Sequence, residues 1–458
     1  MRGGASSGCG QGHIMNILII SSFIEPVQSV ASIRWTKLGK YLALAGHEVS
    51  VLTDEKLYGK EHGAGPLFQI DHGLEKDAVY FNNYYVVRNP LTLRALYWLW
   101  NERNHREKRK RVVSGTAEAR PRANWKTANI KNNLIAKAAI GQYAALADSF
   151  DVVISTFDPL WPHEVAREFK KKNPRLLWVA DFRDPVFGTT HFSDPESKKW
   201  ASEVTETADI VSYIDETGAE VLGIDSSNKR VIAITNGYDA ETVELDQAAS
   251  NPNDAFTVVY TGTLYDLKLQ NPLVVVDALD RLCRTGVARE GTVRFVYAGP
   301  DSDLLSTALR GSHSTEIVDW GLVERGEALQ LQRSADVLAL LTWNNQDERG
   351  IATGKLYEYL SAQRPICAYV SGNVSNSVVK QILDKTGSGA AFEEAGGQAK
   401  AVDEMYSYIC ELYEQWCRTG HTRLAGANPS DYTHEHIAEK LISEIHGSTE
   451  QMAIGPRA

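Results

Sequence analysis

Short runs of almost wholly apolar residues recur along this chain, and amphipathic helical patterns separate them. The first run, Asn16–Ser21, precedes a predicted helix with apolar residues at spacings of three and four between Ile33 and Ala45. Glu48–Thr53 is the next run, and Gly46 stands where a helix-ending glycine is expected. Strands buried on both faces have this composition, and the order strand, helix, strand builds a parallel sheet. The sequence therefore predicts an α/β fold.

The same alternation continues through both halves of the chain. Further strands are predicted at Asp151–Thr156, Leu176–Ala180, Phe256–Thr261, Val293–Ala298, Asp336–Thr342 and Ile366–Val370. Asn271 and Pro272 are expected to supply the cap and first residue of a helix in the second half. A turn-like segment at Asn236–Gly237 separates the two sets of strands.

These elements predict two doubly wound, Rossmann-like domains that face one cleft. We expect an N-terminal domain over 15–237 and a C-terminal domain over 238–430. A helix within 431–458 is expected to pack back on the N-terminal domain. Residues 1–14 are rich in glycine and lack an apolar stretch, so they are interpreted as a leader or disordered segment, with Met15 as the native start.

Composition narrows the possible functions. The formal net charge of −10 disfavours a dedicated nucleic-acid-binding protein. No apolar run approaches the roughly 20 residues of a membrane-spanning helix. The five cysteines are scattered and form no cluster with histidine, so neither a disulfide framework nor a zinc site is indicated. A cytoplasmic location is therefore expected.

The strongest functional signal is the segment Gly350–Pro365, which follows an apolar strand and opens a helix. A helix start can receive a phosphate, Gly354 allows close approach, and Lys355 adds a positive charge. Glu358 lies three residues further, on the same face as Lys355, and could accept both hydroxyls of a ribose. The alternative is a surface ion pair between Lys355 and Glu358.

A second phosphate-binding element is predicted at the start of the same half. The strand Phe256–Thr261 leads into Gly262, where the chain could turn tightly beside a diphosphate. Lys268 follows in this loop and could reach the oxygens that Lys355 reaches. The alternative for Lys268 is a solvated loop lysine.

The order of these segments resembles the family-four glycosyltransferases of the GT-B fold. The resemblance is carried by YTGTLY, VYAGP, VDWGLV, SADVLALL and GIATGKLYEYLSAQRPI in the second half. NILIISSFIEP, GHEVSVLT, STFDP, VADFRDP and ITNGYD agree in the first half. It implies a retaining, nucleotide-sugar-dependent enzyme of bacterial surface-polysaccharide synthesis. It also implies a UDP-sugar donor, a saccharide or lipid-linked acceptor, and no metal or other cofactor.

The resemblance also implies donor-binding residues. Lys268 is similar to the basic residue that contacts the diphosphate, while Thr263 replaces the usual arginine. Glu358 is similar to the second glutamate of the paired-glutamate motif, and Gly350 stands where the first is expected. Backbone N–H groups of 350–353, which include Ile351 and Thr353, would substitute for it. The turn that holds the base corresponds to Gly321, Leu322 and Val323.

The first half is expected to supply the catalytic and acceptor side. Arg183 stands where many relatives have a histidine and could stabilise charge on the leaving phosphate. Asp181 and Asp184 flank it and could orient or deprotonate the acceptor hydroxyl, unless the three residues form a structural network. Asp158 and Arg34 are assigned to the acceptor side, although Arg34 could equally be a solvated helical residue.

One segment departs from the acidic average. Between Asn101 and Lys137 there are 11 Lys or Arg and 3 Asp or Glu, after an aromatic stretch that begins at Leu91. We take 91–137 as a basic, aromatic insertion. Our hypothesis is that it docks peripherally on the anionic inner face of the cell membrane. A solvated basic helix is the alternative.

Two other functions stay open at this stage. A nucleotide-sugar epimerase of the same architecture would consume the donor without an acceptor. An inactive sugar-nucleotide-binding or scaffold protein would bind the donor and convert nothing.

Overall fold

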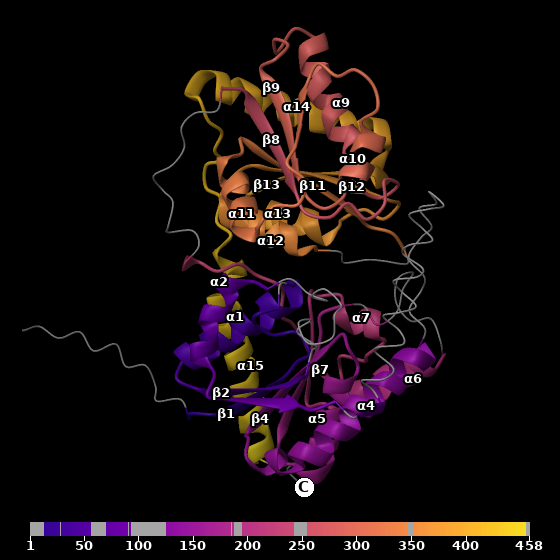
Figure 1. Cartoon of the computed structure of the whole chain (residues 1–458), viewed down its shortest axis with the longest axis vertical. Coiled ribbons are helices and arrows are strands. Elements are labelled where there is room, and N and C mark those ends of the chain that lie inside the picture. The colour runs from indigo at the N-terminus through magenta and orange to yellow at the C-terminus, as the bar shows by residue number, and fades with distance from the viewer. Residues whose placement is uncertain are drawn as a thin grey trace, which may run out of the picture. The chain divides into compact units, whose positions relative to one another are not determined.

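The computed structural model describes residues 13–27, 29–55, 70–89, 91–92, 125–184, 186, 195–241, 254–346 and 352–454. Most of the predicted leader and of the basic insertion lie outside these described residues, as do Gly350 and Ile351. The chain divides into two compact units (Figure 1). Unit 1 comprises Met1–Tyr213, Gly218–Ile232 and Leu441–Ala458, and unit 2 comprises Ile214–Thr217 and Ala233–Lys440.

Unit 1 is built on a seven-stranded sheet of order β3-β2-β1-β4-β5-β6-β7. Its strands are β1 (Asn16–Ile20), β2 (Glu48–Asp54), β3 (Asn83–Val87), β4 (Val152–Phe157), β5 (Leu177–Phe182), β6 (Ile210–Tyr213) and β7 (Arg230–Ala233). Its helices are α1 (Val30–Leu44), α2 (His72–Glu75), η1 (Lys76–Tyr80), α4 (Trp125–Tyr143), η2 (Ala144–Asp148), α5 (Trp161–Lys172), α6 (Pro195–Thr207) and α7 (Gly218–Leu222).

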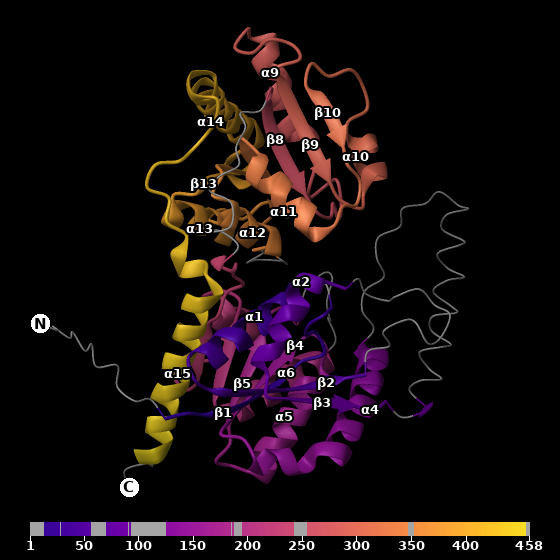
Figure 2. The same cartoon turned by 60° about the vertical axis from the view of Figure 1, so that its left-hand side comes forward.

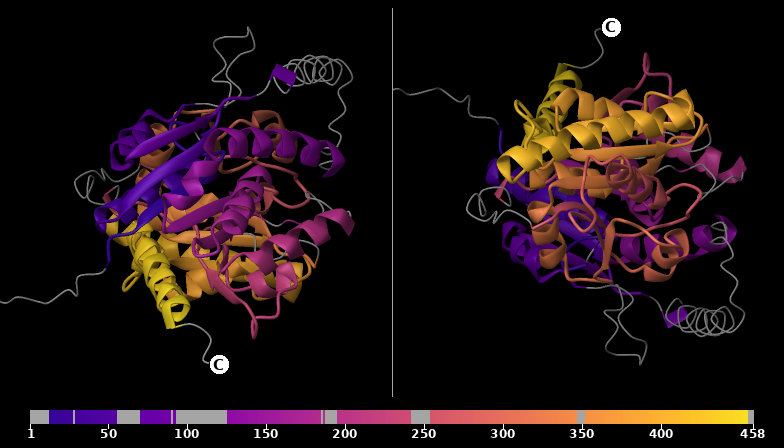
Figure 3. Two further views of the ribbon diagram at one scale, coloured as in Figure 1. Left: turned by 90° about the horizontal axis from the view of Figure 1, so that it is seen from below. Right: turned by 90° about the horizontal axis from the view of Figure 1, so that it is seen from above.

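Helices cover both faces of this sheet. The pairings of β1 with β2 and β4, and of β4 with β5, are all parallel, so the crossover helices on the two sides of β1 lie on opposite faces. Figure 3 shows α1, in indigo, and α4 and α5, in magenta, on opposite sides of the indigo strands. The predicted glycine at the end of α1 is confirmed, since Gly46 has a φ of +95°.

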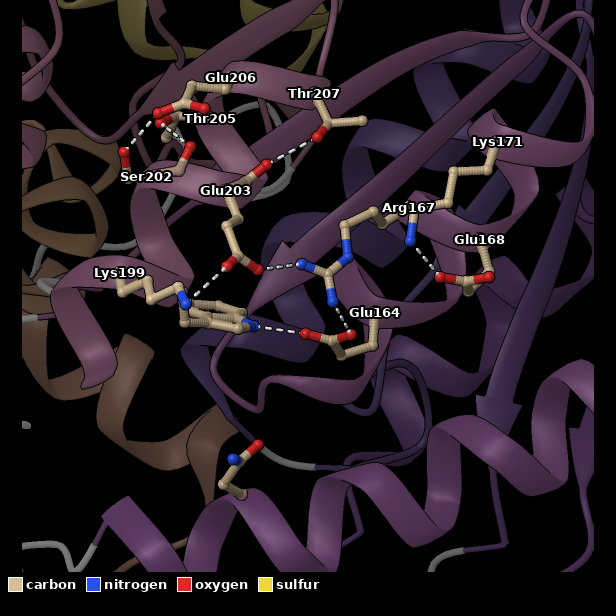
Figure 4. Close-up of polar contacts among 12 residues, drawn as sticks. Glu164, Arg167, Glu168, Lys171, Lys199, Ser202, Glu203, Thr205, Glu206 and Thr207 are labelled. Carbon is tan, nitrogen blue, oxygen red and sulfur yellow. Dashed lines mark hydrogen bonds and ion pairs between the residues drawn. The ribbon is translucent and has the colours of Figure 1, made fainter.

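A charged cluster joins α5 to α6. The guanidinium of Arg167 donates to Glu164 at 2.6 Å and to Glu203 at 2.8 Å, and the indole of Trp200 donates to Glu164 at 2.6 Å. Figure 4 shows Arg167 between the two carboxylates. The cluster thus holds the two helices together, and its charges are paired.

Unit 2 is built on a six-stranded parallel sheet of order β10-β9-β8-β11-β12-β13. Its strands are β8 (Phe256–Thr261), β9 (Val293–Ala298), β10 (Glu316–Asp319), β11 (Val337–Trp343), β12 (Ile366–Ser371) and β13 (Gly389–Glu393). Its helices are α9 (Leu273–Arg284), α10 (Ser302–Ala308), α11 (Arg325–Ser334), α12 (Gly354–Ala362), α13 (Val378–Thr386), η3 (Glu394–Gly396), α14 (Gln398–Thr419) and η4 (Ser430–Tyr432), and α15 (His434–Ile454) follows.

Two hydrophobic cores lie on the two faces of this sheet. Val258 of β8 belongs to the core that includes α9 and α14, and its neighbour Val259 belongs to the core under α11, α12 and α13. Side chains of β11 alternate between the two cores in the same way, with Leu341 in the first and Leu340 in the second. The predicted strands are confirmed to within two residues at each end, because burial on both faces demands the apolar runs that identified them.

The start of α9 differs from the prediction by one residue. Pro272 is the cap rather than the first helical residue, and α9 begins at Leu273. Asn271 still acts as a cap in part, because its side-chain oxygen accepts the N–H of Leu273 at 3.0 Å.

The last helix divides between the two units. From Leu441 onward, α15 belongs to unit 1, where Figure 2 shows its final turns, in yellow, beside the strands. Leu441 and Ile445 are fully buried, and the guanidinium of Arg230 at the start of β7 donates to Glu444 at 2.7 Å. The part of α15 from Leu441 onward is thus an integral part of unit 1.

Two helical glycines of unit 1 give opposite expectations when each is replaced by alanine. A Cβ at Gly39 in α1 would lie 2.4 Å from the ring of Phe81, whereas a Cβ at Gly141 in α4 would meet no atom within 4 Å. We expect Gly39→Ala to lower the free energy of unfolding by about 1–3 kcal/mol. We expect Gly141→Ala to raise it by about 0.5 kcal/mol. Urea unfolding followed by circular dichroism measures both, and equal midpoints for the two variants would contradict the packing described for α1.

Candidate functional site

The first part of the candidate site is the carboxyl edge of the unit 2 sheet. β9 and β10 lie on one side of β8, and β11, β12 and β13 lie on the other. In doubly wound sheets, ligands bind outside the carboxyl ends of the strands at such a switch point. The loop after β8 carries Gly262 and Lys268, and the chain after β11 leads to Lys355 at the start of α12. Both predicted lysines therefore belong to the same edge of the sheet.

Gly262 makes room for the side chain of Lys355. The backbone of Gly262 has a φ of +97°, and a Cβ there would lie 2.6 Å from Cε of Lys355. Nζ of Lys355 donates to the hydroxyl of Tyr260 and to the main-chain carbonyl of Thr263, both at 2.6 Å. Nζ also lies 4.5 Å from the centre of the Tyr260 ring. Lys355 therefore ties the start of α12 to the loop after β8.

This position changes the acid–base behaviour of Lys355. Burial lowers the pKa of Lys355 from 10.5 to about 7, although the charges of Asp301 and Glu358 act in the opposite direction. A large share of Lys355 is therefore neutral at neutral pH. A bound anion would favour the charged form, because an opposite charge nearby raises the pKa of an ammonium group.

The loop after β8 is held in place at several further points. Asp301, at the end of β9, accepts the N–H of Leu264 at 2.9 Å. The fully buried Gln270 accepts the N–H of Tyr265 at 2.8 Å and donates to the carbonyl of Leu341 in β11 at 2.8 Å. These bonds fix the loop against both neighbouring strands, so a ligand would meet a pre-formed backbone.

Lys268 is exposed in this loop. Its main-chain N–H donates to Asp266 at 2.9 Å, and within the described residues its ammonium group has no ion-pair partner. Its charge is therefore free to meet an anion in solution.

The start of α12 leaves N–H groups uncapped. Thr353 precedes the helix but makes no capping hydrogen bond through its side chain. Its hydroxyl is buried and has no partner among the described residues. The first N–H groups of a helix lack partners within it, so those of Gly354 and Lys355 can receive an anion. The predicted contributions of Gly350 and Ile351 lie outside the described residues.

Glu358 is held by two residues of α11. Its Oε1 lies 3.5 Å from Nε of Arg325, and its Oε2 accepts from the amide of Gln332 at 3.4 Å. Among the described residues no ion pair joins Lys355 to Glu358, so the surface-pair alternative is wrong. The Glu358 side chain keeps 30% of its surface exposed. Leu356 and Leu360 of the same helix are buried in the core.

The predicted base-binding turn links β10 to α11. Gly321 has a φ of +61°, its N–H donates to Asp319 at 2.8 Å, and its carbonyl accepts the N–H of Gly299 at 2.8 Å. Leu322 is 61% exposed, and Val323 is exposed in part. The turn therefore presents an apolar surface at the same edge of the sheet.

In unit 1, Asp181 is a structural hub. It is fully buried at the end of β5. One carboxylate oxygen accepts from Arg34 and Ser212 at 2.8 Å, and the other accepts from Trp35 and Thr156 at 3.0 Å. Both oxygens of Asp181 are thus occupied, but not by Arg183, with which the sequence placed it in a possible structural network; its ion-pair partner is Arg34.

Arg34 differs from both predictions made for it. It neither faces solvent nor lies on an open surface, because it is 1% exposed and pairs with Asp181. Local helical spacing could not reveal this partner, which lies 147 residues further along the chain.

Arg183 and Asp184 lie at the carboxyl edge of the unit 1 sheet and remain partly exposed. The guanidinium of Arg183 pairs with Asp184 at 2.5 Å, donates to the carbonyl of Asp158 at 2.7 Å, and lies 5.5 Å from the centre of the Phe23 ring. These partners belong to the loops after β5, β4 and β1. The structure thus brings Arg183, Asp184 and the backbone of Asp158 together at the switch point of this sheet.

His163 lies on α5 and is fully buried. Its Nδ1 is 2.6 Å from the hydroxyl of Ser155, and its ring stacks on Trp200 with centroids 5.9 Å apart. Burial lowers the pKa of His163 to about 3. The ring is therefore neutral and serves the core.

Sequence reasoning missed the residues that support the site. Arg325, Gln332 and Gln270 are absent from its predictions, and each acts through a partner distant in the chain. One signal was available for Gln332: it stands in helical register with apolar residues of α11, where a buried amide needs a specific partner.

The topology and the two switch points place this chain in the GT-B class of α/β folds. It is similar to a trehalose-6-phosphate synthase from Burkholderia multivorans at 11% identity, with 97% of this chain and 99% of that one covered and a TM-score of 0.57. A trehalose-6-phosphate structure from E. coli bound with UDP-2-fluoro glucose matches at 11% identity, with 94% and 98% covered and a TM-score of 0.57. The UDP-GlcNAc 2-epimerase of Methanocaldococcus jannaschii matches at 8% identity, with 95% and 100% covered and a TM-score of 0.51.

These likenesses establish the fold. No protein-family profile matches the chain, and no curated protein matches its sequence significantly.

The described residues contain neither a membrane-spanning helix nor a cluster of metal-binding side chains. None of their helices is both long and apolar enough to cross a membrane. In the same part of the chain, His, Cys, Asp and Glu side chains form no group of three that could hold a metal ion.

The hub at Asp181 predicts a large stability effect. In Asp181→Asn, an amide N–H₂ would face hydroxyl, indole or guanidinium donors, and Arg34 would lose its counter-charge while buried. We expect the free energy of unfolding of unit 1 to fall by about 3–5 kcal/mol. The matched control is Asp184→Asn, where the carboxylate is 38% exposed and the expected change is below about 1 kcal/mol. Urea unfolding measures both, and similar losses would contradict the hub.

Proposed function

We propose that this protein is a retaining glycosyltransferase. It transfers a sugar from a nucleotide diphosphate sugar, with UDP as the expected nucleotide, to a saccharide or lipid-linked acceptor in the synthesis of cell-surface polysaccharide or glycoconjugate. The observation that carries the proposal is the grouping of Gly262, Lys355, the uncapped start of α12 and the partly exposed carboxylate of Glu358 at one switch point.

In this proposal, unit 2 binds the donor. The diphosphate lies against the backbone at Gly262 and Thr263 and the start of α12, with positive charge from Lys268 and Lys355. Glu358 accepts the ribose hydroxyls, and the turn Gly321–Val323 holds the base. Together these groups would take up negative charge as the diphosphate leaves.

Unit 1 binds the acceptor in this proposal. Arg183 stays protonated, so it can stabilise charge but cannot act as a base. Asp184, which is partly exposed, is the carboxylate available to orient the acceptor hydroxyl. Asp181 and Arg34 support this edge from the core. We name no nucleophile, and we expect the reaction to need no metal or other cofactor.

The compared structures support a nucleotide-sugar reaction and also suggest a second candidate. One of them holds UDP-2-fluoro glucose, and another is a UDP-GlcNAc 2-epimerase. An epimerase would use the same donor elements without an acceptor. A protein that only binds the donor is the remaining alternative.

A panel of nucleotide sugars analysed by mass spectrometry separates these functions. Incubation with and without saccharide and lipid-linked acceptors, in the presence of EDTA, should give acceptor-dependent transfer. Isomerisation without acceptor would support the epimerase, and unchanged donors in every mixture would refute both enzymes.

The membrane hypothesis concerns the basic insertion at 91–137. Co-sedimentation with anionic liposomes at low salt tests it, and binding should weaken as salt is added. Absence of binding at low salt would refute peripheral docking and leave the transferase proposal intact.

The donor site predicts losses of affinity in two variants. Glu358→Ala and Lys268→Ala should each weaken UDP binding about tenfold or more, because each removes a charge-assisted contact. Lys400→Ala and Glu404→Ala, on exposed positions of α14, are matched controls that should leave affinity unchanged. Titration calorimetry measures all four, and wild-type affinity in both site variants would refute the assignment.

The low pKa of Lys355 predicts proton-linked binding. Above pH 7, Lys355 of the free protein is largely deprotonated. Binding of UDP therefore requires that Lys355 takes up a proton. Affinity should fall by up to about tenfold per pH unit between pH 7.5 and 9. Lys355→Gln should bind more weakly with little pH dependence over this range. Calorimetry in two buffers of different ionisation enthalpy measures the proton uptake, and an uptake near zero at pH 8 in the wild type would contradict this role for Lys355.

A further inference from the structure

Gln332 is a buried polar side chain that the proposed function does not yet use. It is 1% exposed on α11. Its amide nitrogen donates to the hydroxyl of Thr261 at 2.9 Å and to Oε2 of Glu358 at 3.4 Å. Its amide oxygen is buried and has no partner among the described residues. A buried amide with an unmatched oxygen is costly, which indicates a role beyond packing.

The two contacts of Gln332 join two parts of the proposed donor site. Thr261 is the last residue of β8, directly before Gly262. Glu358 is the proposed ribose ligand on α12. The amide of Gln332 thus bridges the end of β8, where the proposed diphosphate-binding loop begins, to the carboxylate of Glu358, the proposed ribose ligand.

Arg325 completes the support of Glu358 from the same helix. Its Nε lies 3.5 Å from Oε1, while Gln332 contacts Oε2. A carboxylate has about four lone-pair positions, two on each oxygen. Gln332 fills one position on Oε2, while the 3.5 Å contact of Arg325 with Oε1 is an ion pair without a hydrogen bond from Nε, so positions on both oxygens remain for a ligand. Two acceptor atoms on one partly exposed carboxylate match a pair of neighbouring hydroxyl groups.

We infer that Arg325 and Gln332 are positioning residues that orient Glu358 to select a ribonucleotide donor with both ribose hydroxyls over a 2′-deoxyribonucleotide donor. This inference rests on the proposed function and extends it to the sugar of the nucleotide. α11 begins directly after the turn Gly321–Val323, so the same helix connects the proposed base contact with the proposed ribose contact.

The test compares binding of UDP, 2′-deoxy-UDP and inorganic pyrophosphate by titration calorimetry. The full-length wild type should prefer UDP over 2′-deoxy-UDP by about tenfold or more, the effect of one hydrogen bond to a charged group. Gln332→Met removes the amide at similar length and should reduce this preference to about threefold or less. Arg325→Met should act in the same direction. Pyrophosphate affinity should stay near the wild-type value in both.

Controls separate positioning from general damage. Gln330→Met lies on the exposed side of α11 and should keep the full preference. In a Glu358→Ala background, Gln332→Met should cause no further loss of preference, because it acts through Glu358. If Gln332→Met folds poorly, Arg325→Met still tests the inference, because Arg325 is partly exposed and contacts the carboxylate oxygen of Glu358 that Gln332 does not contact.

The outcomes are distinct. If the wild type binds no UDP, the proposed function fails and this inference with it. If the wild type binds UDP and the Gln332 and Arg325 variants keep its preference, the inference alone is overturned. Loss of pyrophosphate binding in parallel with UDP binding would also overturn it, since the effect would then be general.

Discussion

Burial of the central strands on both faces is the constraint on which the rest of this structure depends. Adjacent residues of β8 and β11 enter opposite cores, and neither strand contains a charged residue. The charged groups of the site lie beyond the strand ends, where the crossover loops and helix starts lie. Lys355, Glu358 and the loop after Gly262 are found at one such edge, and Arg183 and Asp184 at another.

Within unit 2, the contact between Gly262 and Lys355 determines where the positive charge of the site lies and how easily it is lost. The missing side chain at Gly262 lets Lys355 fold beneath the loop, where it bonds a tyrosine hydroxyl and a main-chain carbonyl. Burial at this position also lowers the pKa of Lys355. In the absence of a ligand, Lys355 stabilises the loop through these hydrogen bonds. When an anion binds, the same side chain can take up a proton and bind it as a cation. Lys355 therefore contributes both to stability and to binding.

The architecture could be predicted from the sequence, and much of the site could not. Apolar runs mark buried strands because burial on two faces leaves few other compositions, so β8 and β9 were located to the residue. β10 and β13 are partly exposed outer strands and gave no such run. Local spacing correctly placed Lys355 and Glu358 on one helix. It could not show that Lys355 pairs with Tyr260, 95 residues away, because partners of this kind are set by tertiary packing.

The division of α15 has a consequence for biogenesis. Unit 2 occupies one nearly continuous stretch from Ala233 to Lys440, while unit 1 needs residues on both sides of that stretch. Leu441, Glu444 and Ile445, which fill and pair within unit 1, are synthesised after the whole of unit 2. Unit 1 is thus completed after unit 2, against the usual N-to-C order of domain folding during synthesis. Until then, nascent unit 1 exposes the apolar surface that α15 will cover, and a chaperone that recognises such surfaces would find its target there.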